Sequence, residues 1–409
     1  MKYAYTNGVI LTGLEDMQPQ KGLVLCTEGE TICSIRPQGG SLEGYKIIDL
    51  QGKYLMPGLI NLHVHLPASG KPKKKASDPV KLVRLLTGNA VLRRAVQQVC
   101  QGYARTQLYS GVTTIRTVGG VMRFDSTIRD RIQRGEIQGP RILASDMAVS
   151  VPGGHMAYSL AYAAQSAEEA AADVEKIASG GADLIKLMIT GGVLDAKVRG
   201  EPGELKMPPE YVKAACDTAH RLGLKVAAHV ESPEGVRVAL ENGVDTIEHG
   251  AQPDPQILSL FRQRNACLVT TLSPALPYAL FDRSISHASE MEQYNGQVVF
   301  QGIVSCAKAC LEKGIPVGLG TDTGCPYITH YDMWRELNYF RKFCGVTPAF
   351  ALHTATLVNA HIAGIDQLTG SLEEGKCADL LVTEQSPLED LTTLRTPFLV
   401  AARGTPIFS

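Results

Sequence analysis

Two histidines stand one residue apart at the end of an apolar run, Gly-Leu-Ile-Asn-Leu-His-Val-His-Leu at residues 58–66. In a β-strand, residues i and i+2 point to the same face, so His63 and His65 would project together from the end of a buried strand. Two imidazoles on one face form half of a metal site. The alternative is a pair of ordinary histidines packed against a core, and the rest of the chain has to decide.

Other groups that can hold a metal also stand within apolar runs or at their ends. They are Lys186 in the run 184–189, His229 after 226–228, His249 after 246–248 and Asp322 after 317–321. Singly, each has an ordinary explanation: a lysine can extend its amine to the surface, and an aspartate can cap a helix. A buried charge is costly unless it is paired or neutralised, so six such groups at neighbouring strand ends indicate an ion.

The strands that must position these residues alternate with segments of helical spacing. Strands are predicted at 59–65, 112–118, 141–144, 184–189, 226–230, 246–249, 267–272 and 317–321, and helices at 167–179, 209–222, 233–242, 254–264 and 295–313. Eight strand–helix units over roughly 250 residues predict an α/β fold, the (β/α)8 TIM barrel, whose functional residues gather at the C-terminal strand ends. An open doubly wound sheet would carry a glycine-rich turn after its first strand, where this chain has His-Val-His.

Short strands separated by turns occupy both ends of the chain. They fall within residues 1–57 and again after about residue 365, for example at 380–383 and 398–402. We predict that residues 1–57 and 365–409 combine into one small β-sandwich domain, beside a barrel domain of residues 58–364.

Composition narrows the class of protein. The chain has 409 residues, 44% of them hydrophobic, and a formal net charge of -1, which argues against a nucleic-acid partner. The ten cysteines form no CxxC pair, and no signal peptide or membrane-spanning run stands out. We therefore expect a cytoplasmic protein with free thiols and no membrane partner.

The motif at 57–65 (Pro-Gly-Leu-Ile-Asn-Leu-His-Val-His), with Lys186, His229, His249 and Asp322 on later strands, resembles the amidohydrolase superfamily. Within it, the chain resembles the binuclear branch, in the imidazolonepropionase-related and Xaa-Pro dipeptidase-like group. The resemblance implies that Lys186 reacts with carbon dioxide to become N6-carboxylysine, which fits a buried lysine of depressed pKa. It also implies two divalent ions, best assigned as zinc: one held by His63, His65, Lys186 and Asp322, the other by Lys186, His229 and His249.

The resemblance further implies hydrolysis of a C–N bond in an amide, cyclic amide or dipeptide, commonly by a homo-oligomer. A metal-bridging hydroxide would attack, with Asp322 as the catalytic residue that shuttles the proton. Three alternatives stay open: a Xaa-Pro or related dipeptidase or carboxypeptidase, a mononuclear aminohydrolase (deaminase), and a non-catalytic scaffold. Deaminases of this kind usually lack the strand-four lysine, so Lys186 disfavours that alternative.

Loop residues supply the candidate contacts to a small-molecule substrate. His155 either reaches the barrel mouth or lies on the surface, while Gly191 and Gly192 would let a ligand approach the backbone. Glu231 stands where dipeptidase-like relatives often carry Tyr or His; an anion there would repel a substrate carboxylate and attract a cation or an N–H donor. Residues 195–206 are a candidate lid, and the basic tract at 71–75 is either a solvated loop or an attraction for anions.

Overall fold

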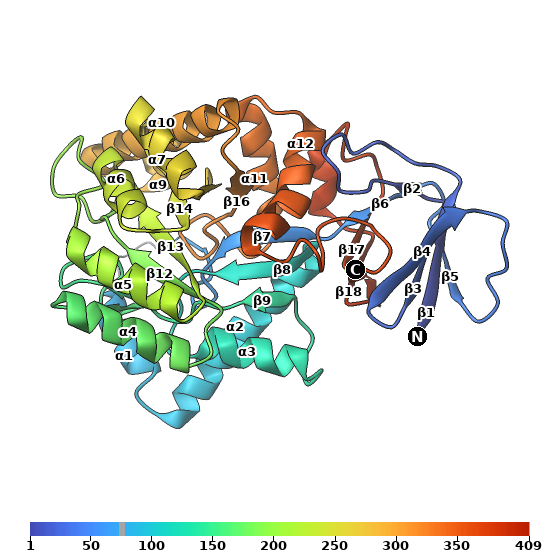
Figure 1. Cartoon of the computed structure of the whole chain (residues 1–409), viewed down its shortest axis with the longest axis horizontal. Helices are drawn as coiled ribbons and strands as arrows, with labels where there is room; N and C mark the ends of the chain where they lie inside the picture. Colours follow the sequence, from blue (N-terminus) through green and yellow to red (C-terminus); the bar gives the residue numbers. More distant parts are fainter. Residues whose placement is uncertain (73–77, 409) are drawn as a thin grey trace.

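A computed structural model describes residues 1–72 and 78–408 of the chain. Three lysines of the predicted basic tract, at 73–75, therefore lie outside the described residues. Figure 1 shows a large body of strands surrounded by helices and, at one end, a smaller group of strands that contains the N-terminus.

Parallel strands form the centre of the large body. They are β7 (Leu59–Val64), β8 (Val112–Thr117), β9 (Arg141–Leu143), β10 (Ala148–Ser150), β12 (Leu184–Met188), β13 (Lys225–Val230), β14 (Thr246–His249), β15 (Cys267–Thr270) and β16 (Val317–Leu319). One sheet runs β7-β8-β9, and the other runs β11-β10-β12-β13-β14-β15-β16, with β11 (Ala161–Ala163) at its edge.

Backbone hydrogen bonds join the two sheets on both sides. The N–H of Asp322 donates to the carbonyl of His63 at 3.0 Å, and the N–H of His65 donates to Thr323 at 2.8 Å, which connects the end of β16 to β7. On the other side, the N–H of Asp183 donates to Ala144 at 2.7 Å, just before β12. The third barrel position is split, because β9 pairs with β8 whereas β10 pairs with β12. The sequence predicted the β9 part only.

Helices follow the strands and cover them from outside (Figure 1). They are α1 (Pro79–Leu86), α2 (Ala90–Tyr109), α3 (Phe124–Gln133), α4 (Ala167–Ser179), α5 (Pro209–Arg221), α6 (Pro233–Glu241), α7 (Pro255–Arg264), α8 (Leu276–Leu280), α9 (Arg283–Ser286), α10 (Glu290–Glu312), α11 (Met333–Tyr339), α12 (Pro348–His353) and α13 (Asn359–Ala363). Side chains that accept from backbone N–H groups begin many of them, such as Ser166 for α4, Ser232 for α6 and Asp254 for α7. Ser289 and Glu292 form a capping box that begins α10 five residues before the predicted start.

The terminal strands form two further sheets. Their strands are β1 (Lys2–Thr6), β2 (Val9–Ile10), β3 (Leu23–Glu28), β4 (Thr31–Pro37), β5 (Lys46–Asp49), β6 (Tyr54–Pro57), β17 (Leu380–Thr383), β18 (Leu399–Ala402) and β19 (Thr405–Phe408). One sheet runs β4-β3-β1-β5, and the other, β19-β18-β17-β6-β2, takes strands from both ends of the chain. Residues of the two sheets share one apolar cluster, which includes Tyr5, Leu25, Leu55, Leu380 and Leu399. The exact domain boundaries at 57 and 365 remain predictions.

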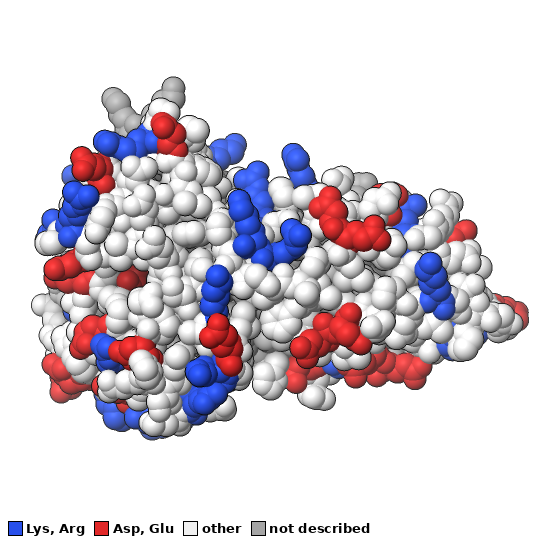
Figure 2. All heavy atoms as spheres, turned by 90° about the horizontal axis from the view of Figure 1, so that it is seen from above, with Lys and Arg blue, Asp and Glu red and all other residues white. Residues whose placement is uncertain are grey.

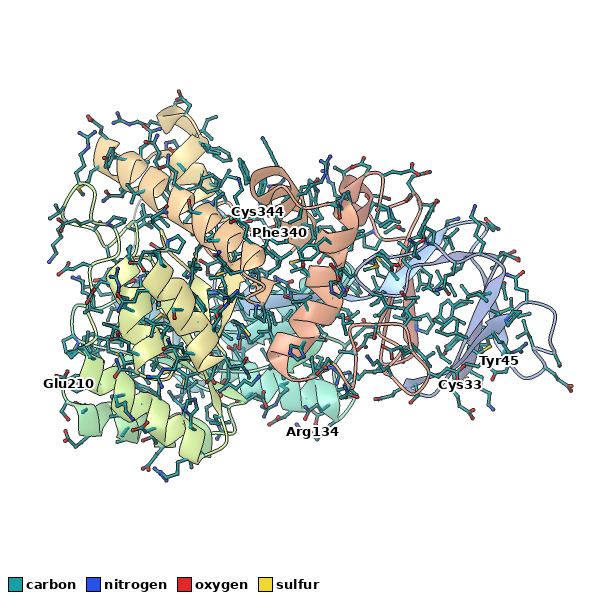
Figure 3. The ribbon with its side chains drawn as sticks, turned by 45° about the horizontal axis from the view of Figure 1, so that its top comes forward. Cys33, Tyr45, Arg134, Glu210, Phe340 and Cys344 are labelled. Carbon is teal, nitrogen blue, oxygen red and sulfur yellow. The ribbon has the colours of Figure 1, made fainter. Side chains whose placement is uncertain are left out.

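Figure 2 shows basic and acidic side chains interspersed over the face that it presents. All ten cysteines are free, among them Cys33, whose Sγ lies 3.6 Å from the hydroxyl of Tyr45 in the terminal sheet (Figure 3). Within residues 1–72 and 78–408, no helix is both long and apolar enough to cross a membrane.

Candidate metal centre

The strand ends bring the six predicted ligands together. His63 lies in β7 with His65 just beyond it, Lys186 lies in β12, His229 in β13, His249 at the last position of β14, and Asp322 shortly after β16. In the parallel register, Met188 is paired with His229 and Val230 with His249, so these side chains emerge at one level. All six side chains are buried. The barrel geometry therefore turns ligands that are far apart in sequence into one cluster.

Two of the six predicted ligands have unusual backbone conformations. His249 has a φ of +68° and Asp322 a φ of +56°, in the left-handed region that non-glycine residues rarely adopt. His249 ends β14 and Asp322 follows β16 by three residues, and at each a sharp turn directs the side chain into the cluster. Such strain costs on the order of 1–3 kcal/mol per residue and is found mainly at functional sites.

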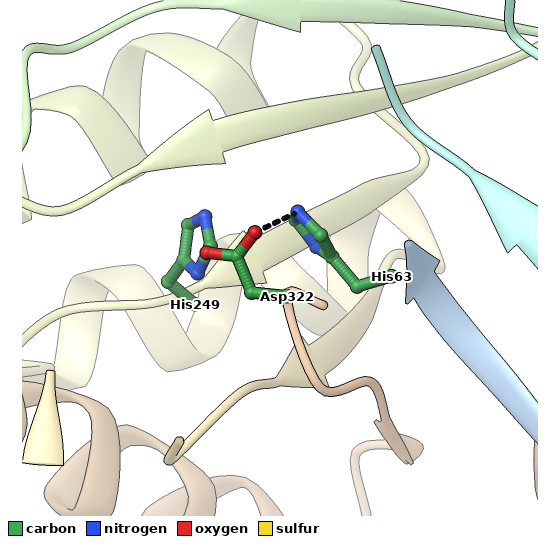
Figure 4. Close-up of side chains that lie close together, drawn as sticks. All are labelled: His63, His249 and Asp322. Carbon is green, nitrogen blue, oxygen red and sulfur yellow. Dashed lines mark ion pairs between the residues drawn. The ribbon is translucent and has the colours of Figure 1, made fainter. Parts of the chain in front are cut away.

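Asp322 is at the middle of the cluster. Its Oδ1 lies 3.1 Å from Nε2 of His65 and 3.5 Å from Nε2 of His63. The potential ligand atoms of His63, His249 and Asp322 all lie within 4.8 Å of one another. Figure 4 shows the carboxylate between the two imidazoles. One ion could contact all three side chains.

Hydrogen bonds behind the imidazoles fix which nitrogen faces the cluster. Nδ1 of His63 lies 2.8 Å from Oε2 of Glu248, Nδ1 of His65 lies 2.8 Å from the carbonyl oxygen of Gly119, and Nδ1 of His249 lies 2.6 Å from Oγ1 of Thr271. When Nδ1–H donates in each contact, Nε2 keeps a lone pair for a metal. His229 is turned the other way: its Nε2 lies 3.3 Å from the Gly191 carbonyl, which leaves Nδ1.

Lys186 is the least expected member of the cluster. Its side chain is fully buried, and Nζ has no hydrogen-bond partner among the described residues. Burial lowers the pKa of Lys186 to about 8, although the carboxylates of Glu248 and Asp322 act in the opposite direction. A neutral amine is therefore accessible near neutral pH, and it is nucleophilic.

Four of the other predicted ligands, His63, His229, His249 and Asp322, have the charge states that a metal needs. Burial lowers the pKa of His63 to about 4, and it holds the pKa values of His229 and His249 well below the usual range. Burial would raise the pKa of Asp322, but the neighbouring His63 and His65 hold it well below its usual range. Neutral imidazoles and an ionised carboxylate suit a divalent ion such as zinc.

Sequence reasoning missed the charged pair behind His63. Nη2 of Arg116 donates to Oε1 of Glu248 at 2.6 Å, and Nε of Arg116 donates to the carbonyl of Leu62 at 2.8 Å. Burial would raise the pKa of Glu248, but Arg116 and His63 lower it, so the carboxylate stays ionised. The sequence did contain one indication of this pair, since Arg116 is the single charged residue of the predicted strand 112–118.

His155 lies at the cluster and not on the outer surface. Its ring stacks on that of His229, with centroids 4.2 Å apart and an interplanar angle of 5°. Nδ1 of His155 lies 2.5 Å from Oδ2 of Asp195, which also accepts the N–H of Gly192 at 3.0 Å. The partner Asp195 comes from the predicted lid. The structure thus links the loop after β10 with the loop after β12.

The predicted lid, residues 195–206, is held at both ends. Asp195 holds its first end through His155 and Gly192. At its last end, the N–H of Gly191 donates to Glu204 at 2.9 Å and the N–H of Lys206 donates to Ile189 at 2.9 Å. At its tip, Oδ1 of Asn295 on α10 accepts the N–H of Gly200 at 2.7 Å, and Nδ2 of Asn295 donates to Val198 at 3.1 Å. The lid is therefore fastened to a barrel helix in this conformation.

Glu231 joins the cluster from the end of β13. The potential ligand atoms of His229, Glu231 and His249 lie within 4.8 Å of one another. Burial, together with Asp322 and Asp195, raises the pKa of Glu231 to about 8. The structure thus places this predicted substrate contact directly beside two predicted metal ligands.

With the geometry established, comparison with known proteins decides the family. The amidohydrolase family profile matches residues 54–405. The chain belongs to the amidohydrolase family. This confirms the resemblance and the barrel fold that the sequence predicted.

Solved and curated relatives agree with this assignment. A crystal structure from Bifidobacterium longum, provisionally named a prolidase, is 38% identical, with a TM-score of 0.88 over all of this chain and 95% of that one. A Xaa-Pro dipeptidase with bound methionine is 27% identical, with a TM-score of 0.88 over the whole of both chains. The ochratoxinase of Aspergillus niger is 25% identical over 370 residues, which cover 84% of this chain and 72% of the relative.

This amidohydrolase is a metal-dependent hydrolase acting on C–N bonds. The family assignment and the buried groups of metal-binding residues support this class jointly. The non-catalytic scaffold considered from the sequence is thereby set aside.

Proposed function

We propose that this amidohydrolase holds two divalent ions, zinc by preference, and hydrolyses an amide, cyclic amide or dipeptide. In the proposal, His63, His65, Lys186 and Asp322 hold the first ion. Lys186, His229 and His249 hold the second. Lys186 contributes to both ion sites as N6-carboxylysine, which forms by reaction with carbon dioxide.

The buried Lys186 carries this proposal. Its Nζ is unpartnered among the described residues and lies within a shell of neutral imidazoles and an ionised aspartate. A bare ammonium there would be left without a hydrogen bond, which is costly. A carbamate would replace the ammonium by an anion with two oxygen donors, which would remove that cost and complete the ligand sets.

The ions would supply Lewis acidity, which activates water and polarises the substrate carbonyl. In the proposal, Asp322 would accept the proton of the attacking water through Oδ1, which is buried and has no conventional hydrogen bond in the described structure. It then delivers this proton to the departing nitrogen, because an amine leaves far more readily than an amide anion. Asp322 is therefore the proposed catalytic residue.

His155 and the two glycines are the proposed substrate contacts. His155, oriented by Asp195 and stacked on His229, would hydrogen-bond a substrate oxygen. At Gly192, a Cβ would lie 3.2 Å from Oε2 of Glu231 and 3.7 Å from Cε1 of His229. The absence of side chains at Gly191 and Gly192 leaves the backbone open to a ligand.

A Xaa-Pro dipeptidase or related carboxypeptidase is the second candidate. The likeness to a Xaa-Pro dipeptidase over the whole of both chains favours it. The Glu231 side chain opposes it when ionised, since a dipeptide ends in a carboxylate of the same charge. We further propose a homo-oligomer in the reducing cytoplasm, the latter supported by the ten free cysteines.

Metal content and lysine chemistry test the proposal. The purified enzyme should contain about two ions per chain, and metal-loaded enzyme prepared in ¹³C-bicarbonate should show a carbamate carbon signal that Lys186→Ala lacks. A screen of dipeptides, N-acyl amino acids and cyclic amides then identifies the substrate class. A Lys186→Ala variant that keeps both ions and its activity would refute the proposal.

A further inference from the structure

One carboxylate oxygen of Glu231, Oε2, is buried without a hydrogen-bond partner in the described structure. A buried carboxylate oxygen in that situation is destabilising unless a proton or a positive group occupies its free side. The oxygen is therefore available to a cation that displaces the proton.

The backbone around Glu231 keeps the carboxylate facing inward. Residues i and i+2 of an extended chain point to the same side, so Glu231 follows His229 into the cluster. The N–H of Glu231 donates to Oγ1 of Thr190 at 3.0 Å. On the lid, a Cβ at Gly203 would lie 2.4 Å from the carbonyl carbon of Glu231, so only glycine permits the lid to pack this closely.

We propose that Glu231 is itself a ligand of the ion held by His229 and His249. The candidate atoms of these three residues lie within 4.8 Å of one another, which a single ion can span after small adjustments of the side chains. Two imidazoles and one carboxylate are a donor set that zinc and similar divalent ions accept. The inference rests on the proposed function in one respect, namely that His229 and His249 bind metal.

The rival role for Glu231 is the one suggested by the sequence, a contact to a cationic or N–H group of the substrate. The two roles predict different measurements. A metal ligand changes ion affinity in the absence of any substrate. A substrate contact changes KM for substrates of different charge and leaves ion affinity as it was.

The test uses the full-length chain, stripped of metal and titrated with Co²⁺ against a competing chelator. In Glu231→Gln, one of the two ions should bind at least ~10-fold more weakly, and the visible Co²⁺ spectrum should change as a ligand is lost. His229→Asn should weaken the same ion, and the double variant should lose less than the sum of the two single losses, because both residues act on one ion.

Asp195→Asn is the matched control, since it also neutralises a carboxylate near Glu231 but one whose Oδ2 is engaged by His155 and Gly192. It should leave both affinities within about 3-fold of the wild type. Circular dichroism checks that each variant folds, and Glu231→Ala replaces Glu231→Gln if the latter does not. Unchanged affinities and spectrum in a folded Glu231 variant, with or without a change in KM, would overturn the proposal. A wild type that binds only one ion would refute the two-ion centre, while the same comparison would still show whether Glu231 holds that ion.

Discussion

Replacing Glu248 by Gln should switch His63 to a form that cannot bind metal. Oε1 of Glu248 accepts from Arg116 at 2.6 Å and from Oγ1 of Thr246 at 2.8 Å, while Oε2 lies 2.8 Å from Nδ1 of His63. The side-chain amide of a glutamine has only one oxygen, and we expect that oxygen to accept from Arg116 and Thr246. Its NH₂ group then faces His63, so Nδ1 must accept and the ring proton moves to Nε2, the nitrogen required by the metal.

The change should affect both the metal affinity and the folding stability. Loss of a supporting hydrogen bond to a metal-binding histidine typically costs ~10–100-fold in metal affinity, which is about 1.4–2.7 kcal/mol. The buried Arg116 also loses its counter-charge, and breaking a buried ion pair costs about 3–5 kcal/mol of folding stability. We therefore expect Glu248→Gln to lower both the metal affinity and the free energy of unfolding of the metal-free chain.

Chelator competition measures the first quantity, and urea unfolding of the metal-free protein measures the second. Asp379→Asn is the control, because Asp379 is also a buried carboxylate paired with an arginine, with Oδ2 at 3.2 Å from Nη2 of Arg141, but it lies at the terminal sheet. The Asp379→Asn variant should lose folding stability and keep the metal affinity of the wild type. Equal metal affinities in Glu248→Gln and Asp379→Asn would refute the tautomer argument.

Three further outcomes are expected. Burial raises the pKa of Glu336 from 4.5 to about 7, so the folded chain keeps a proton that the unfolded chain releases. The free energy of unfolding should therefore fall by up to about 3 kcal/mol as pH rises from about 4.5 to about 7. Urea titrations should show a smaller dependence on pH in Glu336→Gln. Asn295→Ala should cost about 1–3 kcal/mol of lid attachment and speed proteolytic cleavage within 195–206, while unchanged cleavage would show that other contacts hold the lid. Thr271→Val should weaken metal binding by ~10-fold through His249, and equal chelator competition in the two proteins would contradict this.

The sequence was informative where function depends on short, local patterns. The strands that carry His63, Lys186, His229 and His249 are apolar runs whose ends can be read residue by residue, and helix caps such as Ser166 mark where the next helix begins. These patterns sufficed to predict the eight strand positions and to nominate the six residues that the structure brings together.

Contacts between distant segments could not be predicted in the same way. Arg116 and Glu248 are 132 residues apart, and Asn295 meets the lid 95 residues away. Which side chains meet in these contacts depends on the space and polarity of the folded barrel, and no local sequence pattern specifies that environment. The split of the third strand into β9 and β10 likewise depends on which neighbour each half pairs with.

The join between β6 and β7 bears on when the active centre can form during synthesis. β6 runs into the His63 strand after a single residue, Gly58, and it pairs with β17 near the other end of the chain. The N–H of Gly58 itself donates to Asp379 at 2.9 Å. A nascent chain that has reached Asp322 already contains every proposed ligand, yet the partner of β6 is still to be translated. The pairing that anchors β6, and through Gly58 the start of the His63 strand, can therefore form only after residues 380–383 have been synthesised.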